Sequence, residues 1–488
     1  SSQSNSEFFL GGRSMPWWLL GVSMVATTFA IDTPNLVTGI VRRGGVAGNW
    51  VWWAFLLNGM LTVFVYARLW RRSGVQTDLE FYELRYSGPA AAFLRGFRAV
   101  YLGVFFNVMI MATVCLAAVK LGGIAFGWTP LQALLLASLI TVVYSLLGGF
   151  LGVLATDLFQ FVVAMIGSVG AAWWIVDLPQ IGGLTRLLDH PNVTPRLGLF
   201  PDFSDTETTL AIFILPLAVQ WWSVWYPGSE PGGGGYVAQR MLAAKDERHA
   251  VGATLLFNVA HYAVRPWPWI LVAFASLIVY PTLGDLSRAF PHLEPSLVRD
   301  DLAYPAMLSF LPSGLLGLVI ASLIAAFMST ISTHLNWGSS YVVSDLYQRF
   351  YEPDASEKRL VLVGRVATAV LMLLAAWVAI YLESAMQAFE VLLSMGAGTG
   401  LIFILRWFWW RISAQTEIAG MIVSLFVSIF FQFGADFVGL GGLDVSLRLT
   451  ASVVVTTALW LVVTFVTPPT DDATLVRFYR LIRPGGPG

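Results

Sequence analysis

Residues 17–35 read WWLLGVSMVATTFAIDTPN, and residues 221–235 read WWSVWYPGSEPGGGG. Each stretch begins as an apolar membrane helix and is then interrupted by polar residues, by proline or by a run of glycines. Unwound backbone in a bilayer leaves amide and carbonyl groups unpaired, so it persists only where it lines a cavity or binds something. Because one interrupted helix falls in each half of the chain, the pair predicts a secondary transporter with its binding site near the membrane midplane.

The composition is that of a polytopic membrane protein. The chain of 488 residues is 57% hydrophobic and 12% charged, whereas a soluble protein carries about 25% charged residues. A formal net charge of −1 gives no reason to expect nucleic acid as a partner. The single cysteine, Cys115, excludes an internal disulfide, and the five histidines lack the spacing of metal ligands.

Windows of about twenty apolar residues predict twelve membrane spans. They lie at roughly 16–40, 47–69, 93–126, 129–148, 152–177, 207–228, 251–281, 303–346, 360–382, 386–410, 416–434 and 448–467. The third and eighth windows are long enough to carry a bend or an additional interfacial helix. Arginine and lysine concentrate in one set of alternate loops, which include Arg68, Arg71, Arg72, Arg85, Arg95, Arg98, Arg240, Arg349, Arg406 and Arg411. This set of loops, together with the C-terminus, is therefore predicted to be cytoplasmic.

The order of the spans predicts a single transmembrane transporter domain over residues 1–488. It is built from one repeat at about 14–178, a second repeat of opposite topology at about 205–411, and extra C-terminal helices at about 415–468. We also expect the natural protein to extend beyond both ends of this sequence.

Ionisable residues inside membrane spans are costly and mark candidate sites. Asp32, Asp157, Glu230, Arg265 and Glu390 fall in this class. Asp32 and Glu230 lie at the two helix interruptions, although Glu230 could instead cap backbone amides or pair with an arginine. Asp157 lies in the fifth span, where a carboxylate needs a cation or a dense hydroxyl network.

The eighth span carries four hydroxyl side chains close together, those of Ser329, Thr330, Ser332 and Thr333. Hydroxyl oxygens are hard ligands suited to an alkali cation. The alternative is that these hydroxyls bond back to carbonyls of the preceding helical turn.

Several short motifs lie along the chain: FFLGGR at 8–13, TDLEF at 77–81 with Arg85-Tyr86, Gly148-Gly149 with Asp157 and Gln160, Gln239-Arg240 with Ala243-Ala244-Lys245, and AAFMST at 325–330 with Asp345-Leu346-Tyr347. Taken together, these motifs resemble those of the sodium:solute symporter family. The resemblance implies an all-α polytopic membrane protein with an inverted-repeat, five-plus-five helix (LeuT-like) fold and additional flanking helices.

The same resemblance implies where the coupling ions bind. The sodium site shared by the family corresponds to carbonyls of Ala26, Phe29 and Ala326 and to hydroxyls of Ser329 and Thr330. A second sodium site, present in some members, corresponds to Asp157, Ser329, Ser332 and Thr333. Sodium is the expected coupling ion, and no other metal or cofactor is expected.

The predicted solute pocket departs from that of sugar-transporting relatives. Where those relatives have Gln, Glu, Asn and Lys, this chain has Thr33, Asn49, Gly234 and Tyr262. The expected pocket comprises Asp32, Thr33, Asn49, Trp225, Tyr226, Ser229, Glu230, His261 and Tyr262. An aromatic, hydroxyl and acidic pocket suits a sugar-like or cationic solute, whereas Arg265 could instead receive a carboxylate.

These features predict a sodium-coupled symporter that imports a small polar organic solute by alternating access. We expect it in a bacterial plasma membrane among lipids, with sodium and the solute as its partners. The alternative is a transporter-like accessory subunit or sensor without transport activity. An enzyme is not expected, since no arrangement of nucleophile, base and oxyanion donors is evident.

Overall fold

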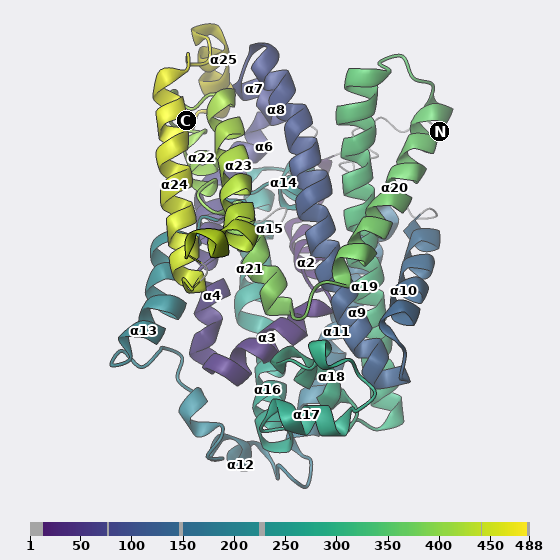
Figure 1. The fold of residues 1–488 in the computed structure, drawn as a ribbon. Helices are drawn as coiled ribbons and strands as arrows, with labels where there is room; N and C mark the ends of the chain where they lie inside the picture. The colour runs from purple at the N-terminus through teal and green to yellow at the C-terminus, as the bar shows by residue number, and fades with distance from the viewer. Residues whose placement is uncertain (1–12, 76–77, 146–149, 224–229, 441, 486–488) are drawn as a thin grey trace.

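A computed structural model describes residues 13–75, 78–145, 150–223, 230–440 and 442–485. These residues form helices and loops without a β-strand, apart from one isolated backbone bridge between Met15 and Ala244. The helices stand side by side in a bundle, with α7 and α25 at one end and α12 and α17 at the other (Figure 1). The all-α prediction is confirmed.

The first half of the chain contains helices α2 to α11. Their bounds are α2 Trp17–Thr27, α3 Asp32–Gly44, α4 Trp50–Trp53, α5 Leu56–Leu61, α6 Ala67–Ser73, α7 Glu80–Arg85, α8 Gly88–Val100, α9 Asn107–Phe126, α10 Pro130–Ser145 and α11 Phe150–Val176. Helical turns of π type at Thr62–Tyr66 and Tyr101–Phe106 join α5 to α6 and α8 to α9.

The second half contains helices α12 to α25. Their bounds are α12 Leu184–Leu188, α13 Thr206–Thr209, α14 Gly235–Ala243, α15 Glu247–Asn258, α16 Trp267–Val279, α17 Leu283–Ala289, α18 Ala303–Leu308, α19 Ser313–Ser340, α20 Glu357–Ala379, α21 Ala385–Gly396, α22 Gly400–Leu405, α23 Ala414–Ile429, α24 Val445–Val466 and α25 Asp472–Ile482. Further π-type turns extend α13 to Gln220, join α15 to α16 and extend α19 to Tyr351.

Six helices in the described residues are long and apolar enough to cross a membrane, or up to eight if each bent pair is one span. Four shorter apolar helices, at 130–141, 206–220, 385–394 and 414–429, coincide with the remaining four predicted windows. The two longest spans, Gly88–Phe126 and Ser313–Tyr351, are the third of each half. Their matched positions agree with the predicted repeat.

The first predicted interruption is confirmed. Helix α2 ends at Thr27, α3 begins at Asp32, and the two axes differ by 66°. Pro34 explains the break, because a proline ring clashes with the carbonyl four residues earlier, that of Ala30, if the helix continues through it. In the first turn of α3 the missing proline N–H costs nothing, since that turn has no intrahelical acceptor for it. Helix α3 consequently runs obliquely across the bundle (Figure 1).

The second interruption lies partly outside the described residues, which omit 224–229 and therefore Trp225, Tyr226 and Ser229. Residues 230–234 are not helical, and α14 begins only at Gly235. Gly232 and Gly233 have φ angles of 83° and 85°, a region that residues with a Cβ rarely adopt. The glycine run thus allows a tight turn, closed by the Gly233 amide donating to the Glu230 carbonyl over 2.7 Å, before α14 begins.

The eighth window, 303–346, divides into α18 and α19, with Pro312 as the residue before α19, as its length led us to expect. Two further irregularities were not expected from hydropathy. The second span bends by 44° between Trp53 and Leu56. The tenth span is interrupted between α21 and α22, where Gly398 has a φ of 78°. The Gly-Ala-Gly-Thr-Gly run at 396–400 was a sequence signal for this last break.

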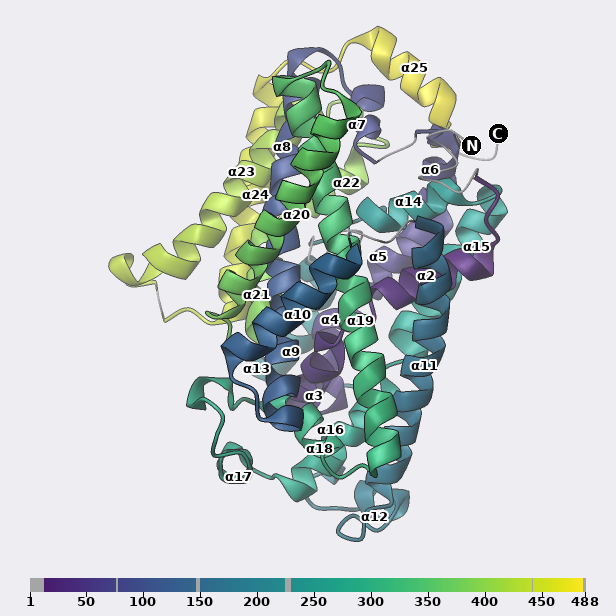
Figure 2. The ribbon, with the colours of Figure 1, turned by 90° about the vertical axis from the view of Figure 1, so that its right-hand side faces the viewer.

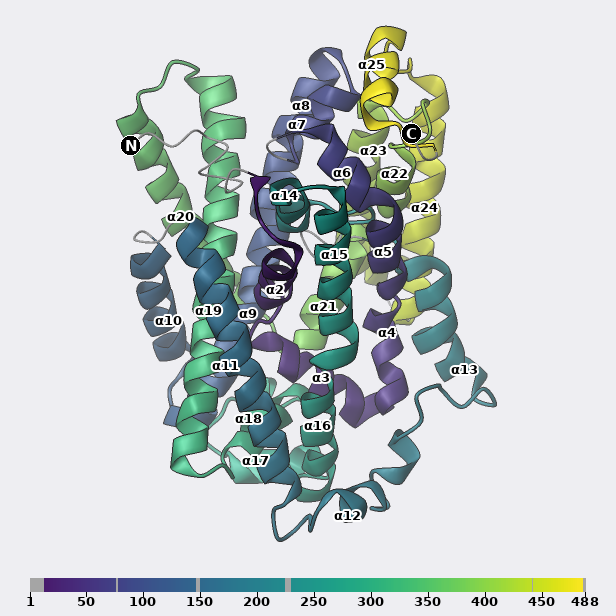
Figure 3. The same ribbon diagram turned by 180° about the vertical axis from the view of Figure 1, so that it is seen from behind.

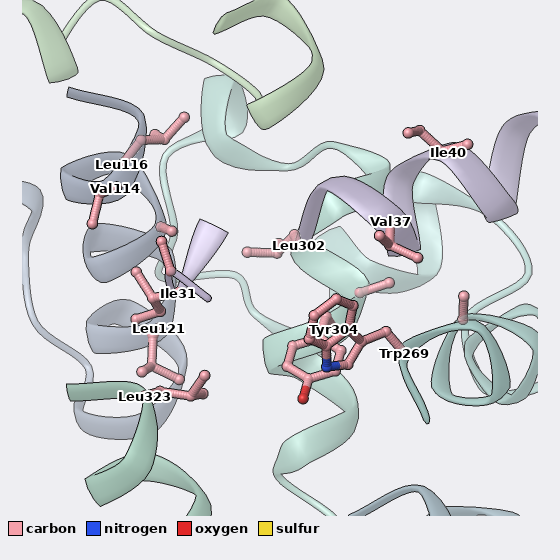
Figure 4. Packing of buried hydrophobic residues seen from close by; sticks show 14 of the residues in the cluster. Ile31, Val37, Ile40, Val114, Leu116, Leu121, Trp269, Leu302, Tyr304 and Leu323 are labelled. Carbon is pink, nitrogen blue, oxygen red and sulfur yellow. The ribbon is translucent and has the colours of Figure 1, made fainter. Parts of the chain in front are cut away.

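The centre of the bundle is packed around α3. Val37 of α3 lies on the side of that helix toward Leu302, Tyr304 and Trp269 (Figure 4), and Ile40 belongs to the same buried cluster. Helix α11 packs against α19 (Figure 2), and α2 packs against α15 (Figure 3). Helix α2 also packs against α11, α14 and α19, so four helices surround the helix that ends at the first break.

Candidate ion and solute sites

The first helix break forms one wall of a cavity inside the bundle. The cavity is lined by Thr28, Ala30, Asp32, Thr33, Leu36, Val37, Trp52, Ile110, Thr113, Val114, His261, Arg265, Ala385, Phe389 and Leu392. These residues come from the break itself, α3, α4, α9, the turns after α15, and α21. Six of the fifteen can form hydrogen bonds through a side-chain hydroxyl, carboxylate, imidazole or guanidinium, and Trp52 adds an indole.

Thr28, His261 and Arg265 form a buried hydrogen-bonded group on the cavity wall. Arg265 Nη1 donates to Thr28 Oγ1 over 3.1 Å, and Arg265 Nη2 lies 3.5 Å from His261 Nε2. The other imidazole nitrogen, Nδ1, lies 3.2 Å from Thr28 Oγ1. Because a guanidinium can only donate, Nε2 of His261 accepts, and the imidazole proton lies on Nδ1. This side of the cavity thus presents a guanidinium held by two neutral partners.

Asp32 is the first residue of α3, where the helix dipole favours a negative charge. Its Oδ1 atom is buried and has no hydrogen-bond partner in the part of the chain that the structure describes. The Thr33 hydroxyl donates weakly to the Thr28 carbonyl, over 3.4 Å. Asp32, Thr33 and His261 therefore line one cavity, and their role in binding a solute stays a prediction.

Asn49 and Tyr262 lie behind Trp52, whereas the sequence predicted them on the pocket wall. The Trp52 indole donates to Asn49 Oδ1 over 2.8 Å, and the Asn49 amide donates to the Val46 carbonyl. The Tyr262 ring stacks on Trp52 with centroids 5.6 Å apart. Both residues hold Trp52 in place, because their polar or aromatic groups are already engaged with it.

Glu230 also differs from the prediction, since it is not among the residues that line the cavity. Its Oε1 atom accepts a hydrogen bond from Arg98 Nη2 over 2.6 Å, and both side chains are 1% exposed. The neighbouring Gly232 amide donates to Asn58, and the Gly232 carbonyl accepts from Trp70. The described part of the second break thus packs on α5, α6 and α8. Glu230 pairs with an arginine, which is one of the two alternatives that the sequence left open for it.

Arg98 and Arg406 were placed among the loop arginines by sequence, but both are buried. Arg406 pairs with Glu417 at 3.4 Å, and each side chain is no more than 1% exposed. The guanidinium groups of Arg98 and Arg406 both lie over the Tyr82 and Phe403 rings. Aromatic faces attract cations, which helps a bilayer protein to bury these charges.

Asp157 joins three helices. Its Oδ1 atom accepts from Ser329 of α19 over 2.9 Å, and its Oδ2 atom accepts from Ser23 of α2 over 3.1 Å. The Ser23 hydroxyl also lies 3.4 Å from Nε of Arg240. The carboxylate is therefore within hydrogen-bonding distance of the hydroxyl cluster on the eighth span, as the sequence predicts for Ser329.

The other hydroxyls of this cluster divide into two kinds. Ser332 bonds back to the Ser329 carbonyl over 3.1 Å, which is the ordinary helical alternative. The hydroxyl oxygens of Thr330 and Thr333 are buried without a hydrogen-bond partner among the described residues. Buried hydroxyls normally find partners, so these two are the oxygens best suited to an additional ligand.

The backbone side of the expected sodium site is also buried. Ala26, Phe29 and Ala326 are 7%, 2% and 4% exposed, at the end of α2, in the break and on α19. The Ala26 carbonyl accepts from the Phe29 amide over 3.0 Å and from the Thr28 amide that caps α2. The described residues contain no group of three or more His, Cys, Asp or Glu that could hold a metal ion.

Sequence reasoning missed several cavity residues, namely Thr28, Trp52, Thr113 and Phe389. Thr28 directly follows α2, so its position in the predicted break could have identified it as a cavity residue. Thr113 and Phe389 belong to α9 and α21, and only the tertiary packing brings these helices to the cavity.

The chain matches known proteins over most of its length. The profile of the sodium:solute symporter family matches residues 8–424. The chain is 26% identical over 453 residues to a sodium/glucose cotransporter of Vibrio parahaemolyticus, with 89% of this chain and 80% of that protein covered. It is also 26% identical to sodium/myo-inositol cotransporter 2 of Mus musculus, with 86% of this chain and 65% of that protein covered.

A solved Na+-coupled sialic acid symporter, in a substrate-bound outward-open state, has the same fold. The TM-score is 0.70 at 21% identity, covering 96% of this chain and 93% of the other. This likeness confirms the inverted-repeat, LeuT-like fold. Since the matched family is a family of transporters and its profile covers most of the chain, sodium-coupled symport is supported over an accessory subunit or sensor. The chain belongs to the sodium:solute symporter family.

Proposed function

We propose that this integral, multi-pass symporter binds sodium between α2 and α19 and binds a small polar organic solute in the cavity beside the first helix break. The observation that carries the proposal is the convergence of two sites on one interrupted helix. Helix α2 packs against α11 and α19, while the residues of the break that follows it line the cavity.

The proposed sodium ligands are the carbonyls of Ala26, Phe29 and Ala326 and the hydroxyls of Ser329 and Thr330. The buried Thr330 oxygen, which has no hydrogen-bond partner in the described residues, supports the proposal. A sodium ion there would replace the missing partner and join α2 to α19.

A second sodium is proposed at Asp157, with Ser329, Ser332 and Thr333. The carboxylate supplies the negative charge that a cation needs in a low-dielectric span. Its hydrogen bonds to Ser329 and Ser23 supply a polar environment that can open to admit the ion.

The proposed solute site contains Asp32, Thr33 and His261, together with Thr28, Trp52 and Arg265. Asn49 and Tyr262 act through Trp52 and need not touch the solute. The relatives compared with the chain are named for glucose and myo-inositol, so a sugar or a cyclitol is the solute that the relatives suggest.

Transport is proposed to run by alternating access, from the outside to the cytoplasm of a bacterial cell. The C-terminus is proposed to lie in the cytoplasm, because it follows the set of loops that is rich in arginine. The repeats are proposed at about 14–178 and 205–411, with the helices at about 415–468 outside them. Sodium binding and solute binding strengthen each other equally, because linkage is reciprocal. Each sodium adds about 2.3 kcal/mol of driving force at 100 mV.

Thermal unfolding of the purified chain in detergent tests this function. Sodium chloride should raise the midpoint relative to potassium chloride at equal ionic strength, by mass action on the folded state. Thr330→Val should shift the half-stabilising sodium concentration at least tenfold. Ser322→Ala is the matched control, because Ser322 of the same helix bonds back to the Val319 carbonyl over 2.8 Å. Equal midpoints in sodium and potassium would reject the proposal.

A further inference from the structure

We infer that the solute is a small zwitterion of the amino acid type, bound with its cationic group at Asp32 and its anionic group at Arg265. The inference rests on the proposed function for the position of the solute cavity. It goes beyond that function by naming the chemical class of the solute and the two residues that select it.

The first observation is that two opposite charges line one cavity. Asp32 and Arg265 are both on the cavity wall. Asp32 has a buried oxygen, Oδ1, without a hydrogen-bond partner in the described parts of the chain. A cationic group of a solute would supply hydrogen-bond donors and the opposite charge at this oxygen.

The guanidinium of Arg265 is fixed for a ligand on the other side. Thr28 and His261 orient it, and the Trp269 ring lies 5.7 Å from its central carbon. These three partners are neutral, so they orient the guanidinium without adding a charge of their own. A carboxylate matches the planar fork of a guanidinium in two parallel hydrogen bonds.

The neutral hydroxyls of the cavity have little to offer a polyol. Thr28 donates its proton to the Val25 carbonyl over 2.9 Å, and Thr113 donates to the Met109 carbonyl over 2.9 Å. The remaining wall is apolar, with Leu36, Val37, Ile110, Val114 and Leu392 among its residues. A sugar carries a hydroxyl on nearly every carbon, and several of these would face apolar side chains without a partner. A zwitterion confines its polarity to two ends.

The test is thermal unfolding of the full chain in detergent, in sodium chloride and in potassium chloride at equal ionic strength. The probes are the twenty standard amino acids, glycine betaine, choline, L-lactate, D-glucose and myo-inositol, each at 10 mM as an order-of-magnitude choice. We expect at least one zwitterion to raise the midpoint further in sodium. Choline, lactate, glucose and myo-inositol should each leave it unchanged.

Variants then locate the site. Asp32→Asn should weaken binding of the stabilising zwitterion at least tenfold and keep the sodium effect. Arg265→Lys should weaken it as well, because an ammonium cannot make the two parallel bonds. Glu390→Gln is the matched control, since it neutralises a half-buried carboxylate that lines a different cavity, and it should keep wild-type affinity.

The outcomes separate this inference from the proposed function. Stabilisation by glucose, myo-inositol, lactate or choline with no response to any zwitterion would overturn the inference and leave sodium-coupled symport intact. If sodium raises the unfolding midpoint but none of the probes changes it, the inference is overturned too. A chain that does not respond to sodium would reject the proposed function itself. Unchanged zwitterion affinity in both Asp32→Asn and Arg265→Lys would refute the assigned residues.

Discussion

Replacing Asp157 by asparagine should reduce the number of coupled sodium ions from two to one. The substitution keeps the size of the side chain and removes the charge that we propose for the second ion. Each sodium contributes about 2.3 kcal/mol at 100 mV, and about 1.4 kcal/mol is a tenfold change in an equilibrium. Losing one ion should therefore lower the maximal solute accumulation about 50-fold at that potential, with sodium equal on both sides.

The hydrogen bonds at Asp157 predict a limited cost to the fold. Ser329 and Ser23 each donate to one oxygen of the carboxylate. An asparagine side chain has a single oxygen, so it can accept only one of these two hydrogen bonds. Hydrogen bonds to charged groups are worth about 1.5–3 kcal/mol each. We therefore expect a folded variant that is less stable by about 1–3 kcal/mol and that still binds the solute.

The assay is the zero-flux potential in proteoliposomes, measured with a potassium diffusion potential and the solute identified by the stabilisation panel. Its dependence on the solute gradient at a fixed sodium gradient gives the number of ions per solute, because for a solute without net charge that slope is inversely proportional to the number of coupled sodium ions. Glu390→Gln serves again as the carboxylate control. A stoichiometry that is the same in the wild type and in Asp157→Asn would refute the second site and make Asp157 a structural residue.

Three further predictions concern other parts of the chain. Thr330→Val should raise the sodium concentration for half-maximal uptake at least tenfold while the solute affinity at saturating sodium stays the same. Glu230→Gln removes the counter-charge of the buried Arg98 and should lower the free energy of unfolding in denaturant by about 3–5 kcal/mol. A second substitution, Arg98→Met, should restore most of this loss. Gly400→Ala should lower the unfolding midpoint, because a Cβ there would overlap the Trp222 carbonyl oxygen; Gly314→Ala, with nothing within 4 Å of its Cβ position, should not lower it.

Local sequence predicts those features of the fold that depend on local chemistry. The first break follows from Pro34 and the polar residues around it, since both act within one helical turn. The apolar windows fall on the observed helices because a membrane span must satisfy its own backbone hydrogen bonds. The bend near Ala54 was not predictable in this way, because its residues are as apolar as those of a straight span.

The site residues show where local reasoning stops. Asp157 was found from hydropathy, because a carboxylate in an apolar span is costly wherever its partners lie. Glu230 drew attention for the same reason, but its partner Arg98 lies 132 residues away in sequence. Charge counting in loops placed Arg98 outside the membrane core, whereas α8 extends the third span and buries it. An ion pair of this kind depends on packing between helices that no local pattern specifies.

Coupling between ion and solute can follow from the geometry of one helix. Ser23 of α2 bonds to Asp157, and Thr28, one turn and a half later, bonds to His261 and Arg265 on the cavity wall. The Thr28 hydroxyl is itself tied to the Val25 carbonyl of α2. A movement of α2 toward α19 on sodium binding would therefore carry Thr28 and reorient the guanidinium that we propose for the solute anion. Both the ion and the solute act on the end of α2. Coupling therefore requires no chain of contacts beyond this helix.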